Sequence, residues 1–243
     1  MQYCSAAPVT RYIPYTGSAL SRCGSGRHRY CELYLGMAHP SHAALGCHDQ
    51  HHDDATFPPQ LYYAKNHLWL DLNDDGTFHI GIDALLAQVL GRVEKILYLP
   101  IHPHTRPSAI LSVKGVDLQV VFPNIVDVTG TNTYLRANPE RLTADPYGRG
   151  WLFEGGEPRQ HDQHRTTITE GLLQAEQARQ WTSSDVQRLT SFLHEKSSQP
   201  DEAGMALMND GGDPAPGVAE LLTRDDVIQL FNELFSPYAS LRK

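Results

Sequence analysis

The sequence predicts a mainly β fold with α-helical extensions, an α+β class, and three observations support this. Short runs of branched apolar and aromatic residues, separated by Gly, Pro and Asn, occupy residues 60 to 155, a pattern typical of a small barrel or sandwich. The pair Asp75–Gly76 is typical of a hairpin turn. Beyond residue 156, apolar residues recur at helical spacing.

The central region begins with a strand expected over Leu61–Leu72, followed by a turn at 73–76 and a return strand over Thr77–Ile82. Asp83 is a suitable N-cap for a short helix, and Gly91 is a suitable stop for it. Further short strands are expected over Val93–Leu99, Ala109–Lys114, Leu118–Phe122 and Ile125–Val128.

The C-terminal region is expected to be helical. One apolar face at helical spacing is formed by Leu172, Ala175, Ala178, Trp181, Val186, Leu189 and Leu193. A loop rich in Gly, Asp and Pro is expected over Ser197–Gly217. Thr223 and Asp226 then resemble a capping box, with Asp in place of the usual Glu or Gln, and they predict the start of a last helix.

These differences in residue pattern divide the chain into three expected parts. Residues 1–58 form a Cys/His-rich N-terminal segment, residues 59–155 the β-rich central domain, and residues 156–243 the helical C-terminal extension. A length of 243 residues is enough for one good core with extensions. The division therefore predicts a single central β-domain with flanking segments.

Charge and hydropathy exclude several classes of partner. The net charge of −8 argues against nucleic acid and anionic membranes as partners. No apolar run approaches the length that crosses a bilayer. Residues 1–10 have neither the basic start nor the apolar block of a secretory signal. A cytoplasmic location is therefore expected.

Three stretches carry a family resemblance: Asn66–Trp69, Asp75–Thr77 and Asp145–Phe153. Together with the order of strands and helix between them, they make residues 61–155 similar to the H protein of the glycine cleavage system, a lipoyl-domain family. The longer flanks resemble a bacterial H-like subgroup with a Cys/His-rich N-terminal segment. The resemblance implies a lipoyl-like barrel-sandwich domain.

The resemblance also implies a function for one lysine. The family carries its lipoyl lysine in Glu-Ser-Val-Lys-Ala, and this chain has Leu111-Ser112-Val113-Lys114-Gly115. Lys114 is thus the expected attachment site for lipoic acid, and the chain is expected to be a carrier without its own active site. It would shuttle an aminomethyl or similar group between glycine decarboxylase, an aminomethyltransferase and dihydrolipoyl dehydrogenase, all implied by the resemblance.

Two alternatives remain beside the carrier hypothesis. Lys114 is also an ordinary polar residue for an exposed hairpin, where lysine usually lies in solvent. The family's Glu is Leu111 here, and Pro123 lies nine positions after Lys114 rather than eight. These departures and the long flanks favour a non-lipoylated H-like scaffold or interaction protein. An independent enzyme has no acid–base or nucleophilic set in its favour.

The cysteines raise the question of a metal. Cys4, Cys23, Cys31 and Cys47, with nearby histidines, offer enough soft ligands for one tetrahedral zinc. No Cys-x-x-Cys pair is present, so the alternative is a set of ordinary thiols beside surface histidines. In a cytosol, disulfides between them would be unusual.

Overall fold

The computed structural model describes residues 2–3, 12–13, 57–102, 105–156, 168–197, 207 and 214–236. The chain forms two compact units, Met1–Thr56 and Phe57–Lys243. In the first unit, strands β1 (Gln2–Tyr3) and β2 (Tyr12–Ile13) pair antiparallel. The second unit holds all the other described elements. The expected division at residues 58 and 155 stays a prediction.

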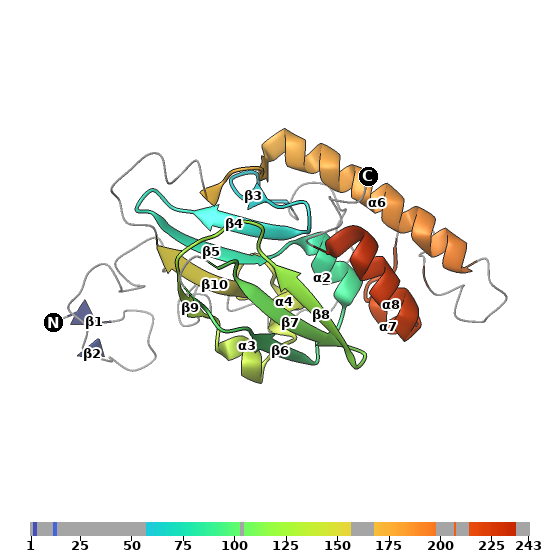
Figure 1. Cartoon of the computed structure of the whole chain (residues 1–243), viewed down its shortest axis with the longest axis horizontal. Helices are drawn as coiled ribbons and strands as arrows, with labels where there is room; N and C mark the ends of the chain where they lie inside the picture. Colours follow the sequence, from blue (N-terminus) through green and yellow to red (C-terminus); the bar gives the residue numbers. More distant parts are fainter. Residues whose placement is uncertain are drawn as a thin grey trace. The chain divides into compact units, whose positions relative to one another are not determined.

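Two antiparallel sheets form the second unit (Figure 1). The larger sheet has the order β11–β3–β4–β5–β10–β9 and the smaller sheet the order β6–β7–β8. The strands of the larger sheet are β3 (Tyr62–Tyr63), β4 (Leu68–Leu72), β5 (Thr77–Ile82), β9 (Val128–Thr131), β10 (Trp151–Gly156) and β11 (Leu173–Gln174). Those of the smaller sheet are β6 (Lys95–Tyr98), β7 (Ser108–Val113) and β8 (Val116–Val121).

One apolar core joins the two sheets. In β7, Ala109, Leu111 and Val113 are buried while the residues between them are partly exposed, so one face of the smaller sheet is turned inward. Strand β5 lies between β4 and β10 and is buried along its whole length, so both of its faces are covered. The predicted mainly β, mixed α+β class is confirmed.

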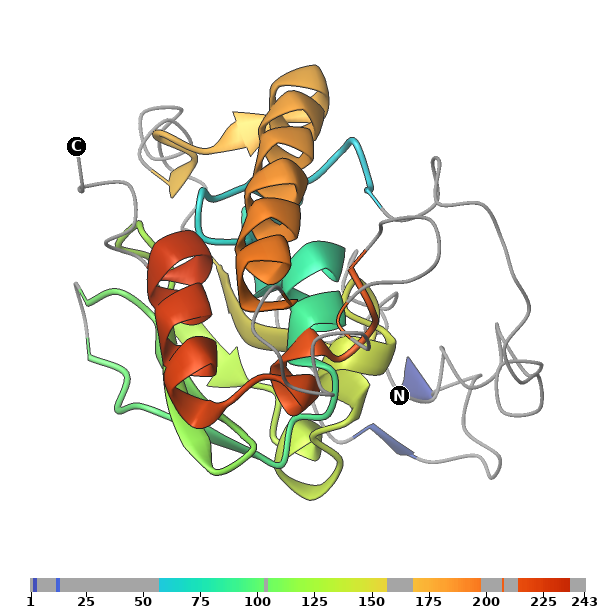
Figure 2. The same cartoon turned by 90° about the vertical axis from the view of Figure 1, so that its right-hand side faces the viewer.

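Helices complete the unit (Figure 2). They are α2 (Ala84–Leu90), α3 (Tyr134–Ala137), α4 (Arg141–Ala144), α6 (Ala175–Ser197), α7 (Val218–Leu221) and α8 (Arg224–Leu230), and α8 continues into a π-helical turn, η3 (Phe231–Phe235). Asp83 caps α2, its Oδ1 accepting from the Leu86 N–H at 2.9 Å. Thr223 caps α8 and bonds to Asp226. Both predicted caps are confirmed.

Several strand predictions need correction. The strand expected over Leu61–Leu72 is wrong: it is two strands, β3 and β4, which form a hairpin. The chain reverses between them because His67 adopts a left-handed φ of 62°. The strand expected over Ile125–Val128 is also wrong, since β9 starts at Val128 and Ile125 is 52% exposed.

The expected helical face beginning at Leu172 is wrong at its start. Leu173 and Gln174 pair with Tyr63 and Tyr62 as β11, so the helix α6 begins only at Ala175. Sheet pairing with a strand more than a hundred residues earlier overrides the local helical spacing here. The return strand predicted over Thr77–Ile82 is confirmed.

Candidate functional site

Lys114 lies at the tip of the β7–β8 hairpin. The last paired residues are Val113 and Val116, so Lys114 and Gly115 form a two-residue turn. Both have positive φ, 52° and 68°, as a type I′ turn requires. Lys114 is exposed, and a side chain added at Gly115 would meet nothing within 4 Å. A group attached to Lys114 would therefore start from a turn whose backbone is fixed by the paired strands.

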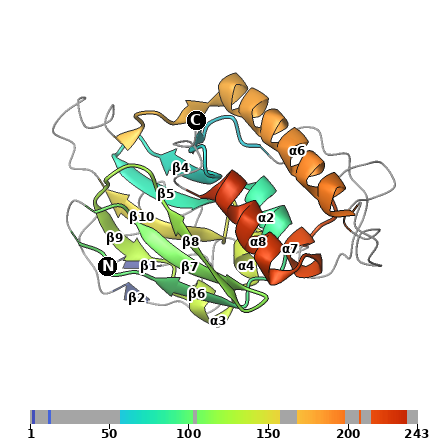
Figure 3. The ribbon, with the colours of Figure 1, turned by 45° about the vertical axis from the view of Figure 1, so that its right-hand side comes forward.

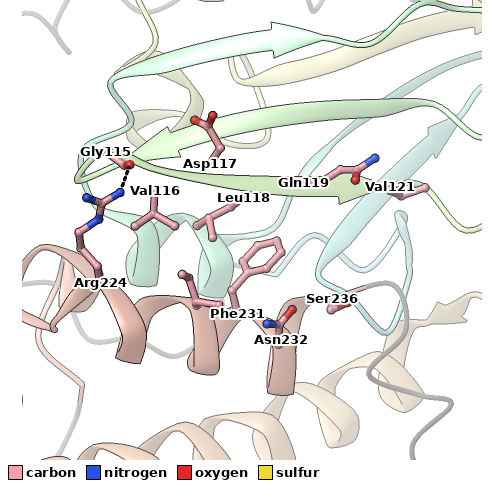
Figure 4. Close-up of a pocket in the computed structure, with 11 residues that line it drawn as sticks. Gly115, Val116, Asp117, Leu118, Gln119, Val121, Arg224, Phe231, Asn232 and Ser236 are labelled. Atoms are coloured by element: carbon pink, nitrogen blue, oxygen red, sulfur yellow. Dashed lines mark hydrogen bonds between the residues drawn. The ribbon is translucent and has the colours of Figure 1, made fainter.

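The amine of Lys114 contacts the C-terminal part of the chain. Its Nζ donates to the carbonyl oxygens of Leu222 at 2.6 Å and Glu220 at 3.0 Å. Arg224 donates from Nη2 to the carbonyl oxygen of Gly115 at 2.9 Å (Figure 4). The turn is thus exposed on one side and held by the segment around α7 and α8 on the other.

Leu111, which replaces the family's glutamate, has no exposed surface and belongs to the core. Its place in the β7 pattern puts the side chain on the inward face together with Ala109 and Val113. An ionised carboxylate there would lose its hydration, which is costly without a partner. In this chain the position therefore contributes to packing.

A groove of about 590 Å³ runs between β8 and the helices α8 and η3. Its lining starts at Gly115 and includes apolar Val116, Leu118 and Phe231 together with polar Asn232 (Figure 4). Figure 3 shows α8 lying alongside the smaller sheet. The groove begins one residue from Lys114.

A second cluster, which sequence reasoning missed, is a buried group of charges around His67. Its Nδ1 lies 2.7 Å from Asp83 Oδ2, and its Nε2 lies 3.3 Å from Asp185 Oδ2. His67 has no exposed surface, and Asp83 and Asp185 are also buried. Arg188 adds a fourth charge, with its Nη1 2.8 Å from Asp185 Oδ1. Two cations thus balance two carboxylates.

The pKa of His67 reflects this environment. Burial alone lowers the pKa, but the charge of Asp83 and the hydrogen bonds to Asp185 and Asp83 outweigh it and raise the pKa to about 9. Burial alone raises the pKa of Asp185, but the hydrogen bonds from His67 and Arg188 lower it overall. Because a carboxylate faces each ring nitrogen, both nitrogens donate and the ring is an imidazolium.

This cluster predicts a pH dependence of stability. The folded-state pKa of His67, about 9, lies above its ordinary value of 6.5. Its stabilising contribution is therefore complete below pH 6.5 and is lost as the pH rises through 9. The shift corresponds to about 3 kcal/mol.

Denaturant unfolding at a series of pH values checks this. The wild-type chain is expected to lose this stability between pH 6.5 and 9, whereas a variant without the imidazole changes far less over the same range. Equal slopes for the two proteins would contradict the assignment. Asp185 acts in the opposite direction: its contribution is present above pH 3.8 and is lost as the pH falls through its lowered pKa.

The sequence held little that could have revealed this cluster. Asp83 was identified only as a helix cap, and it is also a partner of His67. Asp185 lies 118 positions after His67, on the helix α6. No local pattern connects residues at that separation. The one available signal was a charged side chain, Asp185, next to apolar Val186 on the predicted helix.

The Asp145–Gly148 stretch is a structural turn that leads into β10. The carboxylate of Asp145 accepts from the backbone N–H groups of Gly148 and Arg149 at 3.1 and 3.0 Å. Trp69 donates from Nε1 to the carbonyl oxygen of Ile82 at 2.7 Å, and both Trp69 and Trp151 are buried. These residues position the larger sheet and do not line the turn at Lys114.

No metal site is found in the part of the chain that the structure describes, where no three His, Cys, Asp or Glu side chains are grouped to hold an ion. The predicted zinc ligands Cys4, Cys23, Cys31 and Cys47 lie outside the described residues. The zinc hypothesis therefore stays a prediction. Among the described residues, no helix has the length and apolar character to cross a membrane.

Comparison with known proteins gives a consistent result. The sequence profile of the family described as "Glycine cleavage H-protein" matches residues 61–185, which end inside α6. The chain is 36% identical over 104 residues to the glycine cleavage system H protein of Psychrobacter cryohalolentis, covering 41% of this chain and 81% of that protein. It is 32% identical over 129 residues to the Neisseria meningitidis serogroup C protein of the same name, covering 50% and 93%.

Among solved structures, the chain is similar to a glycine cleavage system H protein from Mycobacterium marinum. The sequence identity is 20% and the TM-score is 0.41, with 53% of this chain and 98% of that chain covered.

Proposed function

Because the chain belongs to the glycine cleavage H-protein family, whose members are lipoyl carriers rather than enzymes, we propose that Lys114 carries lipoic acid in amide linkage. The supporting observation is the position of Lys114 at an exposed two-residue turn between β7 and β8. Paired strands hold the backbone on both sides of this turn, so the attachment point is fixed while the side chain extends from it.

The residues around the turn fit such an attachment. The side chain of Lys114 leaves the hairpin beside Gly115, where a Cβ added to the glycine would meet no atom within 4 Å apart from the adjacent residues. Amide formation joins Nζ to the lipoyl carbonyl carbon, Nζ loses its charge, and the activating group on that carbonyl leaves. The attached group supplies thiol–disulfide chemistry. The groove between β8 and α8 offers it an adjacent surface.

The finer assignments follow the family resemblance. The transferred group is an aminomethyl or similar group, and the partners are glycine decarboxylase, an aminomethyltransferase and dihydrolipoyl dehydrogenase in the cytoplasm. A tethered cofactor reaches each partner at high effective concentration, without diffusing free. A Lys114 that cannot be modified would remove this advantage.

The test of the proposal is lipoylation of the full-length chain. Incubation with lipoate, ATP and a lipoate ligase is expected to add the mass of one lipoyl group, and peptide mapping is expected to place it on Lys114. Lys114→Arg is expected to abolish the addition completely, because arginine keeps the charge but has no acylable amine under these conditions. Intact-mass spectrometry provides the measurement.

Lys95→Arg is the matched control. Lys95 is an exposed lysine on the neighbouring strand β6, paired with Ser112. This variant is expected to be lipoylated like the wild type. Modification of Lys95 in place of Lys114, or no modification of either lysine, would contradict the carrier function.

A second candidate function has its own supporting observation. Lys114 Nζ is hydrogen bonded to two backbone carbonyls of the C-terminal region, as expected for a lysine that stabilises a helix end. This favours a non-lipoylated H-like scaffold in which the lysine has a structural role. Two measurements separate the candidates: the stability of the Lys114→Arg variant and the lipoylation experiment. In the second, a scaffold protein stays unmodified.

A further inference from the structure

The amine of Lys114 caps the C-terminal end of a helix that lies far away in the sequence. The carbonyls of Glu220 and Leu222, 106 and 108 positions later, accept from its Nζ. They lie at the C-terminal end of α7, where backbone carbonyls have no partner within the helix. Lys114 therefore serves as the polar cap of α7.

The same segment binds the rest of the turn. Arg224 donates to the Gly115 carbonyl oxygen at 2.9 Å (Figure 4), and Glu220 Oε1 accepts from the backbone N–H of Arg92 at 2.7 Å. We call residues 214–236 the latch segment. It contacts the hairpin tip through Glu220, Leu222 and Arg224.

The latch segment is anchored beside α2. The backbone N–H of Gly217 donates to the Gln88 carbonyl oxygen at 2.8 Å, and Gln88 Nε2 donates to the Pro214 carbonyl oxygen at 3.1 Å. Gly91 and Gly217 approach so closely that a Cβ on Gly91 would lie 2.5 Å from the Cα of Gly217. Val218 is fully buried. The contact is therefore a packed interface as well as a set of surface hydrogen bonds.

We propose that the latch segment is an autoinhibitory cover that controls acylation of Lys114. This inference rests on the proposed function, because it regulates the site of lipoylation. Acylation needs the nitrogen lone pair, so Nζ must lose a proton, and it must also turn away from the carbonyls of Glu220 and Leu222 far enough for an activated acyl carbon to reach it. Breaking these hydrogen bonds is easier when the latch segment has moved locally away from the hairpin tip at Glu220, Leu222 and Arg224, so this local opening is expected to speed acylation.

The first experiment measures amine reactivity without any enzyme. The full-length chain is pulsed with an acetylating N-hydroxysuccinimide ester, and the labelling rate of each lysine is read by peptide mass spectrometry. Lys114 is expected to label about tenfold more slowly than exposed Lys95, given the strength of hydrogen bonds made by charged groups. Equal rates for Lys114 and Lys95 in the wild-type chain would overturn the proposal.

Two variants release the latch segment in different ways. Glu220→Ala combined with Arg224→Ala removes the bonds to Arg92 and Gly115. Gly91→Ala places a methyl group against the backbone of Gly217. Each is expected to raise the labelling rate of Lys114 most of the way to that of Lys95. A rate unchanged in both variants would overturn the proposal, and thermal unfolding confirms that each variant is folded.

Asp225→Asn is the matched control on the same turn of α8. Asp225 is exposed and follows Arg224 directly, and this variant is expected to label like the wild type. If Asp225→Asn raised the labelling rate of Lys114 as much as the release variants do, any change in α8 would have the same effect. That result would contradict a specific role of the latch segment as a cover.

A ligase experiment separates this inference from the proposed function. With lipoate and ATP, the release variants are expected to be lipoylated faster than the wild type. If their Lys114 acetylates rapidly but is never lipoylated, the carrier function fails while the cover remains. If the wild type lipoylates at the same rate as the release variants and acetylates freely, the cover fails while the carrier function remains.

Discussion

Replacing His67 with Asn is expected to lower the free energy of unfolding by about 3–5 kcal/mol below pH 6.5. The change removes the cation that lies between Asp83 and Asp185. Two buried carboxylates then remain in the cluster, and only Arg188 is left there to balance their charge. Asn is chosen because it tolerates the left-handed φ of this position. The loss in the free energy of unfolding therefore measures the contributions of charge and packing, with little contribution from backbone strain.

Denaturant unfolding measures this loss, and Lys65→Asn is the matched control. Lys65 is exposed in the same turn, and a surface change there is expected to stay within about 0.5 kcal/mol. A loss below about 1 kcal/mol for His67→Asn would show that the charge cluster adds little to stability, as some buried ion pairs do. The tilted ring contact between His67 and Trp181, with centroids 4.3 Å apart, is lost in the same variant.

Replacing Gly155 with Ala is expected to destabilise the larger sheet by about 3 kcal/mol, the upper part of the range for overpacked cores. A Cβ at this position would lie 2.1 Å from Cζ of Phe78 and 2.3 Å from the carbonyl oxygen of Asp127. Phe78 is completely buried, so its ring has no free space into which it can move. The Asp127 oxygen belongs to the backbone just before β9, so its displacement disturbs the pairing of β9 with β10.

Gly171→Ala provides the contrast for this measurement. A Cβ at Gly171 would meet nothing within 4 Å, but the residue has a φ of 72°. The cost there comes from the left-handed backbone alone and is expected to be about 1 kcal/mol. Thermal unfolding of the two variants separates the steric cost from the conformational cost. A Gly155→Ala chain as stable as Gly171→Ala would contradict close packing at β10.

The sequence was sufficient wherever structure depends on neighbouring residues. Asp75–Gly76 predicted the β4–β5 turn, and Asp83 and Thr223 predicted two helix starts through caps that need only the next three residues. The β7–β8 hairpin could also be predicted, because Lys114–Gly115 interrupts two short apolar runs. The same pattern predicts that Lys114 lies at the tip of this hairpin.

Predictions failed where distant segments decide the structure. The run from Leu61 to Leu72 is interrupted by Lys65, Asn66 and His67, but the interruption contains neither Gly nor Pro, so the strand was predicted to continue through the reversal at His67. Leu173 and Gln174 follow a helical pattern but pair with β3. The contacts around the candidate site have the same origin: Lys114 meets Glu220 and Leu222, and His67 meets Asp185, across more than a hundred residues.

The position of Asp185 has a practical consequence for truncation. A chain cut after residue 156 would keep the β7–β8 hairpin but lose Asp185 and Trp181, so that His67 would face solvent with a single aspartate. A cut directly after α6 would still remove Phe235, whose ring lies 5.0 Å from that of His67, centroid to centroid. The smallest fragment with an intact interior therefore runs from Phe57 to at least Phe235. The C-terminal helices are part of this domain and cannot be removed without opening its interior.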